Sequence, residues 1–160
     1  MSKKVLLIAL IVGVAALFVG PGIYAGNKLE DVIKMEDPAY KEREYKTVSF
    51  GHKKHVDEYK VTCAECHHED KDGKSVPLAN LKEGDDVKRC IECHKKPGYI
   101  KGKDAKGLSD QQKREYHANA IHDNCKDCHK DHNKKKGLKP KDKDAAPTNC
   151  KECHGGKLKG

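Results

Sequence analysis

The strongest constraint on this chain is a five-residue motif, Cys-x-x-Cys-His, that occurs four times. The four copies use all eight cysteines, and a histidine follows the second cysteine of every copy. Successive copies begin 27, 35 and 25 residues apart, which is too irregular for a solenoid of repeated fold units. The chain must therefore fold around four chemically equivalent sites. The motifs are Cys63-Cys66-His67, Cys90-Cys93-His94, Cys125-Cys128-His129 and Cys150-Cys153-His154.

The rest of the sequence offers little material for a hydrophobic core. The 160 residues include no Trp and two Phe, and 36% are charged. The apolar fraction is also 36%, but much of it lies in one run over residues 5–19. A chain of this composition stays largely disordered unless something other than its side chains supplies a core.

The histidine of the motif distinguishes among three uses of a cysteine pair. Such pairs occur in zinc sites, in redox dithiols and in covalent haem attachment sites. Histidine fills 10 of 160 positions, so its presence after all four pairs is very improbable by chance. Four-cysteine zinc sites do not need it, and exported dithiols tend to oxidise to disulfides. Covalent haem needs both parts, because the thiols add to its vinyl groups and the histidine ligates its iron. The sequence therefore predicts a multihaem cytochrome c with four covalent haems (heme c).

Histidines outside the motifs can supply the second axial ligand of every iron. Met35 is the only methionine beyond Met1, so methionine cannot serve four sites. Bis-histidine ligation leaves no open position for a substrate, so we expect an electron carrier rather than an enzyme. Adjacent side chains diverge, so His68 can reach a different iron from its neighbour His67 and hold two haems close together. The six available histidines are His52, His55, His68, His117, His122 and His132.

One stretch of the sequence resembles a known family. The segments Phe50-Gly-His-Lys-Lys-His55 and Cys63-Ala-Glu-Cys-His-His68, followed in order by the other three motifs, are similar to the class III cytochrome c family. These are small, low-potential tetrahaem carriers of anaerobic bacteria. The resemblance covers about residues 45–154. It implies mostly irregular backbone, with a few short α-helices and a small N-terminal β element wrapped around four covalent haems. Some members space two of their cysteine pairs four residues apart, whereas all four pairs here are two residues apart.

The resemblance also implies a distal ligand for each haem. His55 would ligate the first haem, His68 the second and His52 the third. The fourth distal ligand should lie shortly before the third motif, where both His117 and His122 occur. We expect His122, three residues before Cys125, with His117 as the alternative.

The N-terminal residues predict export. Lys3 and Lys4 precede the apolar run 5–19, and Ala25-Gly26 offers a small-residue cleavage site. A run of 15 residues is short for a bilayer span, which needs about 20. We expect a signal peptide over residues 1–25, a loosely attached charged arm over 26–44 and a tetrahaem domain over 45–160, located in the periplasm. An uncleaved membrane anchor is the alternative.

Local patterns predict few regular elements. Residues 108–125 favour a helix capped by Ser109 or Asp110. Residues 45–50 favour a short strand, and a short helix is possible around residues 29–35. The lysine-rich, glycine-punctuated segments 71–86 and 95–107 are typical of surface loops.

The charge is concentrated at the C-terminal end. Residues 26–125 contain 20 basic and 20 acidic side chains, whereas residues 126–160 contain 11 lysines and five acids. Such a run is typical of a solvated surface, and an exported chain without aromatic residues among these lysines is a poor candidate for nucleic acid binding. We expect it to dock an acidic redox protein near the fourth haem. The lysines expected to take part are Lys134, Lys135, Lys136, Lys139, Lys141 and Lys143.

The resemblance implies that such a carrier moves electrons between hydrogenase or formate dehydrogenase and membrane or extracellular acceptors. A membrane-anchored tetrahaem quinol dehydrogenase also combines an N-terminal apolar segment with four such motifs. About forty residues separate the two features here, which favours the carrier. A small nitrite or sulfite reductase would need a five-coordinate iron, and the surplus of histidines argues against one.

Overall fold

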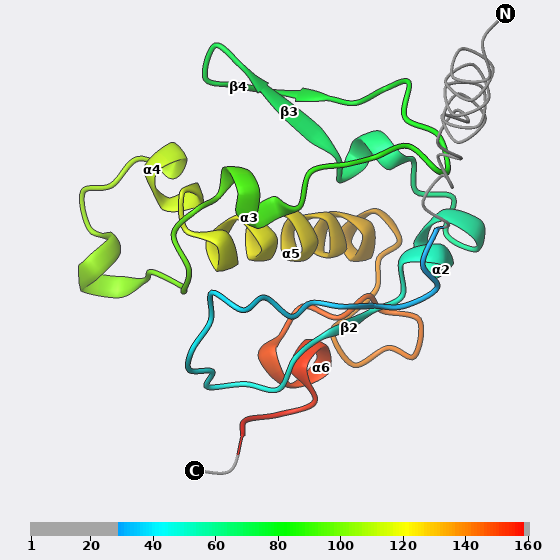
Figure 1. Cartoon of the computed structure of the whole chain (residues 1–160). Coiled ribbons are helices and arrows are strands. Elements are labelled where there is room, and N and C mark those ends of the chain that lie inside the picture. The colour runs from blue at the N-terminus through cyan, green and yellow to red at the C-terminus, as the bar shows by residue number, and fades with distance from the viewer. Residues whose placement is uncertain (1–28, 159–160) are drawn as a thin grey trace, which may run out of the picture.

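A single long helix organises the described part of the chain. The structure is a computed structural model, and it describes residues 29–158. Helix α5, His117–Lys135, spans 19 residues and runs through the middle of the molecule (Figure 1). The other helices have six residues or fewer: α2 (His52–Asp57), α3 (Cys90–Cys93), α4 (Asp110–Arg114), α6 (Cys150–His154) and the 3-10 turns η1 (Cys63–Glu65) and η2 (Gly102–Ala105). Most of the backbone is irregular, as predicted.

Two small antiparallel sheets complete the fold. Strands β1 (Ile33–Lys34) and β2 (Ser49–Phe50) pair in one sheet. Strands β3 (His68–Lys71) and β4 (Lys74–Pro77) form a hairpin that projects from the molecule (Figure 1). The hairpin turns at Asp72-Gly73, where both residues have positive φ of 55° and 74°. That backbone matches the right-handed twist of the strands, and Asp-Gly is a preferred sequence for it.

Four local predictions need correction. Residues 29–35 form no helix but contain β1, and the expected strand over 45–50 is limited to β2 and an isolated bridge between Tyr45 and Lys157. The expected loop over 71–86 contains β4. The expected helix over 108–125 is divided, because Tyr116 leaves the helical conformation and bridges to Lys96, after which α5 continues through the third motif. Ser109 caps α4 as predicted, with its side chain accepting from the Gln112 amide.

The N-terminal arm is tied to the domain rather than loosely attached. Asp37 is buried, and its carboxylate accepts a hydrogen bond of 2.5 Å from Arg89, the residue before the second motif. Tyr40 contacts His117, with 3.0 Å between its hydroxyl oxygen and the ring Nδ1. The Glu44 carbonyl accepts from the Leu158 amide near the other end of the described chain. These contacts join residues 37–44 to the second motif, to α5 and to the C-terminal segment.

No hydrophobic side chain is buried anywhere in residues 29–158. The three buried residues are the polar Asp37, Asn119 and Asn133. Both asparagines project from α5 and hold a loop by two hydrogen bonds, Asn119 to the amide and carbonyl of Ile100, and Asn133 to those of Ala146. The described side chains thus position backbone around α5 without forming an apolar core of their own.

The predicted signal peptide, residues 1–25, lies outside the described residues. Within residues 29–158, no helix has the length and apolar character needed to cross a bilayer.

Candidate functional site

The four Cys-x-x-Cys-His motifs share one local structure. Each begins in, or lies within, a helical segment: η1, α3, α5 and α6. A helical turn brings the two cysteines, three residues apart, to one face. The histidine follows at the end of η1 and α3, and it lies inside α5 and α6. Each motif can therefore present two thiols and one imidazole to a single flat ligand.

Every motif histidine faces a second histidine at nearly the same distance. The ring centroids of His52 and His67 are 6.1 Å apart, and those of His68 and His94 are also 6.1 Å apart. His55 lies 6.2 Å from His129, and His122 lies 6.2 Å from His154. With metal–nitrogen bonds of about 2 Å on each side, one metal ion between two imidazoles needs ring centroids roughly 6 Å apart. Each pair thus has the spacing of an axial ligand pair.

The predicted partners of two histidines are wrong. The prediction assigns His52 to the third motif and His55 to the first, but the ring of His52 lies opposite His67 and that of His55 lies opposite His129. Both lie on α2, where three residues turn the side chain by about 300° around the helix axis, so the two rings point to different neighbours. The spacing F-x-H-x-x-H does not say which ring faces which motif. That depends on how α2 packs.

The structure separates the two candidates for the fourth distal position. His122 is the histidine that faces His154. His117, the first residue of α5, instead contacts the Tyr40 hydroxyl. His132 lies near the end of α5. Among the described residues, its ring forms no pair with a motif histidine.

Backbone carbonyls fix the orientation of four of these rings. The Nδ1 atoms of His94, His129 and His154 lie 2.5, 2.7 and 2.7 Å from the carbonyl oxygens of Arg114, Pro147 and Lys46. His55 Nδ1 lies 2.8 Å from the carbonyl oxygen of Gly51. A carbonyl only accepts, so each Nδ1 carries the proton and each Nε2 presents its lone pair to a metal. Such outer hydrogen bonds are typical of metal-ligating histidines.

Burial keeps several of the paired rings neutral. It lowers the pKa of His52, His67 and His122, and neighbouring histidines add to the effect. Nδ1 of His122 is the one buried side-chain nitrogen or oxygen in residues 29–158 without a hydrogen-bond partner. A neutral imidazole is the form that binds a metal, so the environment favours ligation.

Four of the thiols have pKa values shifted in the direction opposite to that of redox or zinc-binding thiols. Burial raises the pKa of Cys66, Cys90 and Cys153, and it raises the pKa of Cys125 to about 11, with neighbouring Cys66 and Cys90 contributing. None of the eight cysteines forms a disulfide, and six of them are exposed, so their side chains border open space. Reactive dithiols and zinc ligands instead have lowered pKa values. In the described residues, no three Cys, His, Asp or Glu side chains form a cluster that could hold a metal ion by themselves.

These residues fit haem and define a class of protein. Two axial histidines and a nearby pair of thiols are what the chain must contribute to a covalent haem whose macrocycle supplies the other four iron ligands. Four such sets define a multihaem c-type cytochrome. A family model confirms this, since the model of the class III cytochrome c family matches residues 29–154. The chain belongs to that family, whose members are electron carriers and generally not enzymes, and its four cysteine pairs match their four covalent c-type haems. Searches of curated proteins and of solved structures gave no match.

Lysines and tyrosines surround the fourth histidine pair. The ring of Tyr99 packs against His122 with 4.9 Å between centroids, and that of Tyr45 packs against His154 at 5.3 Å. The ammonium of Lys101 lies 5.8 Å from the Tyr99 ring, and that of Lys157 lies 5.4 Å from the Tyr45 ring. Lys126 is close enough to lower the pKa of His122, after the larger effects of burial and of His154. These three lysines differ from the six that the sequence pattern indicates. Lys126 and Lys157 belong to the same basic segment, residues 126–160, whereas Lys101 comes close to the fourth pair only through the fold.

Proposed function

We propose that this protein is a low-potential periplasmic electron carrier in which every haem is ligated by two histidines. The observation that carries the proposal is the set of four histidine pairs, each with ring centroids 6.1 or 6.2 Å apart. The proposed axial pairs are His67 with His52, His94 with His68, His129 with His55, and His154 with His122. When bound, each haem would supply a one-electron Fe(III)/Fe(II) couple, and the two histidines of a pair would hold its iron.

The hydrogen bonds of the ligands support a low potential. Two neutral imidazoles lack the thioether that raises the potential of other c-type haems. Donation of the Nδ1 proton to a carbonyl makes the ring a stronger electron donor, which stabilises the oxidised iron. Periplasmic location follows from the export signal predicted over residues 1–25.

Intact mass and the visible spectrum test this proposal. After expression in a host that matures c-type cytochromes, we expect the mass of a chain beginning at Gly26 with four haems. We also expect low-spin bands that carbon monoxide does not change, because both axial positions are filled by histidine. Fewer haems or a carbon monoxide shift in the native protein would contradict the ligand set, and a retained N-terminus in the membrane fraction would favour the anchored quinol dehydrogenase.

The surroundings of the fourth pair support docking of an acidic redox partner, such as a hydrogenase or formate dehydrogenase domain. The positive charge there comes from Lys101, Lys126 and Lys157. An electron from a partner bound at these lysines would have only a short distance to travel to the haem held by His122 and His154. Positive charge around an electron entry point speeds encounter with an acidic partner more than it tightens the complex. The acceptor side would be a membrane or extracellular redox protein.

Replacing Lys101, Lys126 and Lys157 with glutamine is expected to slow reduction by an acidic ferredoxin about tenfold at low ionic strength. The difference should shrink as salt screens the charges. The measurement is the second-order rate constant in stopped-flow mixing over a range of salt. A matched control neutralises Lys71, Lys74 and Lys82, which lie on and after the hairpin. A further variant neutralises Lys134, Lys135 and Lys136 and tests whether the lysines expected from the sequence also take part. Equal rates for all variants would contradict docking at the fourth pair.

A further inference from the structure

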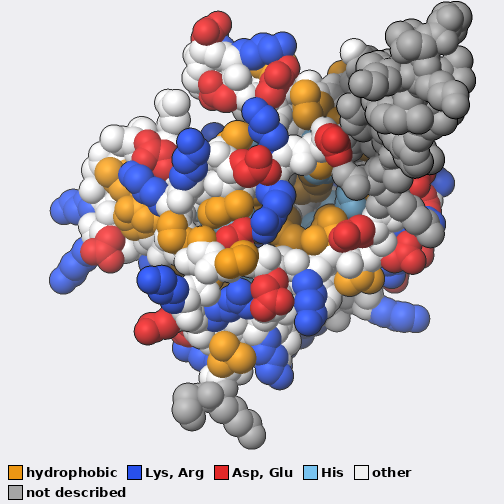
Figure 2. Space-filling model, viewed as in Figure 1, with side chains coloured by type: hydrophobic (Ala, Val, Ile, Leu, Met, Phe, Trp, Pro, Cys, Tyr) orange, Lys and Arg blue, Asp and Glu red, His pale blue; other side chains and the backbone are white. Residues whose placement is uncertain are grey.

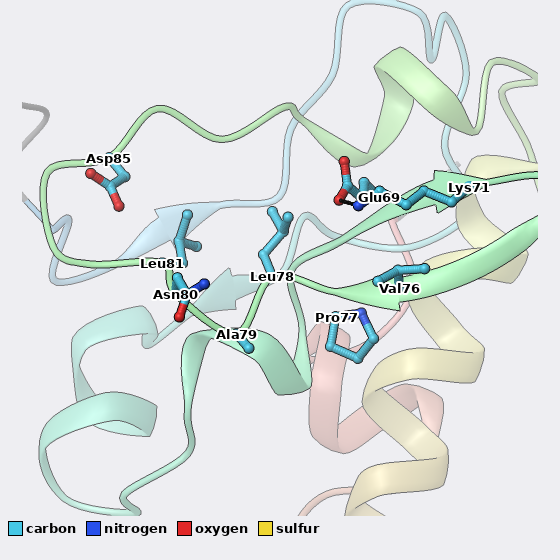
Figure 3. A pocket seen from close by; sticks show the side chains of 9 residues that line it. All are labelled: Glu69, Lys71, Val76, Pro77, Leu78, Ala79, Asn80, Leu81 and Asp85. Atoms are coloured by element: carbon cyan, nitrogen blue, oxygen red, sulfur yellow. Dashed lines mark ion pairs between the residues drawn. The ribbon is translucent and has the colours of Figure 1, made fainter.

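A second surface feature lies at the β3–β4 hairpin. Residues of the hairpin and of the loop after it line an open hollow of about 380 Å³. Figure 3 shows Leu78 and Leu81 pointing to the same side, into the space between Glu69 and Asp85. The side chains of Val76, Leu78 and Leu81 are half-buried, so they form an apolar floor that solvent still reaches.

This hollow faces away from the haem ligand on the same hairpin. His68 pairs across the strands with Pro77, whereas Glu69 pairs with Val76. Successive side chains of a strand point to opposite faces, so Glu69 and Val76 lie on the face opposite His68. Pro77, the cross-strand partner of His68, also lines the hollow, so the hollow borders the second histidine pair at the hairpin backbone. The amide of Leu78 donates to the carbonyl of His67 at 2.9 Å, which brings the first pair equally close.

The segment that carries the hollow is acidic. Residues 68–86 contain six acids and three lysines, for a net charge of −3. The acids are Glu69, Asp70, Asp72, Glu83, Asp85 and Asp86. Figure 2 shows acidic side chains and lysines spread over the projecting hairpin. An apolar floor with an acidic surround complements a surface that has apolar side chains among lysines.

The opposite end of the molecule has that complementary chemistry. In Figure 1 the hairpin and α6 lie on opposite sides of α5. Beside the fourth pair, the apolar side chains of Tyr99 and Leu158 are 49% and 48% exposed, next to Lys101 and Lys157. Large exposed apolar side chains surrounded by charge are typical of contact surfaces.

We call the surface formed by Tyr99, Lys101, Lys157 and Leu158 the lysine-rich end. We propose that the hairpin hollow docks the lysine-rich end of a second copy of this chain, with Tyr99 and Leu158 against Val76, Leu78 and Leu81. The two surfaces are different, so the contact is head-to-tail and leaves both outer ends open for further copies. A hollow of this size supports only a small interface, which is typical of transient electron-transfer contacts.

Docking in this way connects the fourth histidine pair of one copy to the first and second pairs of the next. One electron leaves the donor copy, which is oxidised by one electron, and enters the acceptor copy, which is reduced by one. No proton or other reactant is consumed, and the reaction between identical copies has no net driving force. The inference rests on the proposed function, because electrons pass through the lysine-rich end both in docking of an acidic redox partner and in docking of a second copy.

Charge reversal on each surface, followed by mixing, tests the contact in the holoprotein. The first variant is E69K/E83K, which leaves in place Asp70 and Asp85, whose carboxylates accept from backbone amides of the turns. The second is K101E/K157E. A matched control, E58K/D131K, reverses two exposed acids that lie after α2 and on α5. The readouts are amide NMR shifts on dilution of the oxidised protein, and the electron exchange rate from haem-methyl exchange in partly reduced samples.

Each variant alone is expected to lose the dilution-dependent shifts and to exchange electrons about tenfold more slowly than the wild type at low ionic strength. An equal mixture of the two variants should restore both signals, because each then meets opposite charge on its partner. The control should match the wild type. Unchanged exchange in E69K/E83K, or no recovery in the mixture, would overturn the inference. Normal reduction of E69K/E83K by an acidic ferredoxin would show that the proposed function stands independently.

Discussion

Replacing His122 with alanine is expected to convert one haem of the four to a high-spin form that binds carbon monoxide. His122 is the only described histidine whose ring faces His154 at axial spacing, so its loss leaves one coordination position without a side chain. Its Nδ1 is buried without a hydrogen-bond partner, and among the described residues no second histidine pairs with the His154 ring. The change should appear as a carbon monoxide shift in one quarter of the absorbance, together with a rise in one of the four reduction potentials.

His117→Ala is the matched control, because His117 lies five residues away on the same helix. Its ring contacts the Tyr40 hydroxyl and no motif histidine, so all four haems should remain low-spin. Loss of that contact should loosen the N-terminal arm without leaving a coordination position of any iron vacant. A carbon monoxide shift in His117→Ala but not in His122→Ala would reverse the assignment.

The amino-acid sequence predicts the chemistry of the site better than its geometry. The motif specifies two thiols and one imidazole within five residues, and this local information is enough to infer the cofactor and the family. Which motif histidine lies opposite His52 and which lies opposite His55 depends instead on the orientation of α2, and the predicted assignment exchanged the two. Likewise, Lys101 reaches the fourth pair only because Asn119 holds the loop at Ile100 against α5.

The secondary structure is predictable where a local signal is strong. Ser109 with Gln112 forms a capping box, and α4 begins there as expected. The Asp72-Gly73 turn is an equally strong signal for a hairpin, but the charged and glycine-rich composition of the segment favours a loop. The break at Tyr116 has no local signal, since it depends on the bridge to Lys96 from a distant segment.

The chain produced without haem is expected to be unfolded. Ordinary domains gain their stability, about 5–15 kcal/mol net, mainly from buried apolar side chains. Residues 29–158 bury no hydrophobic side chain at all, and both sheets have only two strands. Two-stranded sheets and helices of six residues or fewer are marginal in water, and even α5 has a strongly polar sequence. The side chains of the chain therefore cannot outweigh the conformational entropy of ordering it.

Haem attachment would change this balance, because the two cysteines and the histidine of one motif would be joined through the haem to a distal histidine elsewhere in the sequence. His154 and His122, or His129 and His55, would become linked through one iron, so the binding free energy acts as folding free energy.

Expression of the mature chain in a cytoplasm that lacks c-type maturation should give protein of haem-free mass. Its amide NMR spectrum should be poorly dispersed, its far-ultraviolet circular dichroism should lack most helix, and heating should produce no cooperative transition. The holoprotein from a maturing host is the control and should show all three signs of a fixed fold. A dispersed spectrum with a cooperative transition in the haem-free chain would mean that polar contacts such as those of Asp37, Asn119 and Asn133 hold the backbone by themselves, and that the four histidine pairs are formed before the cofactor binds.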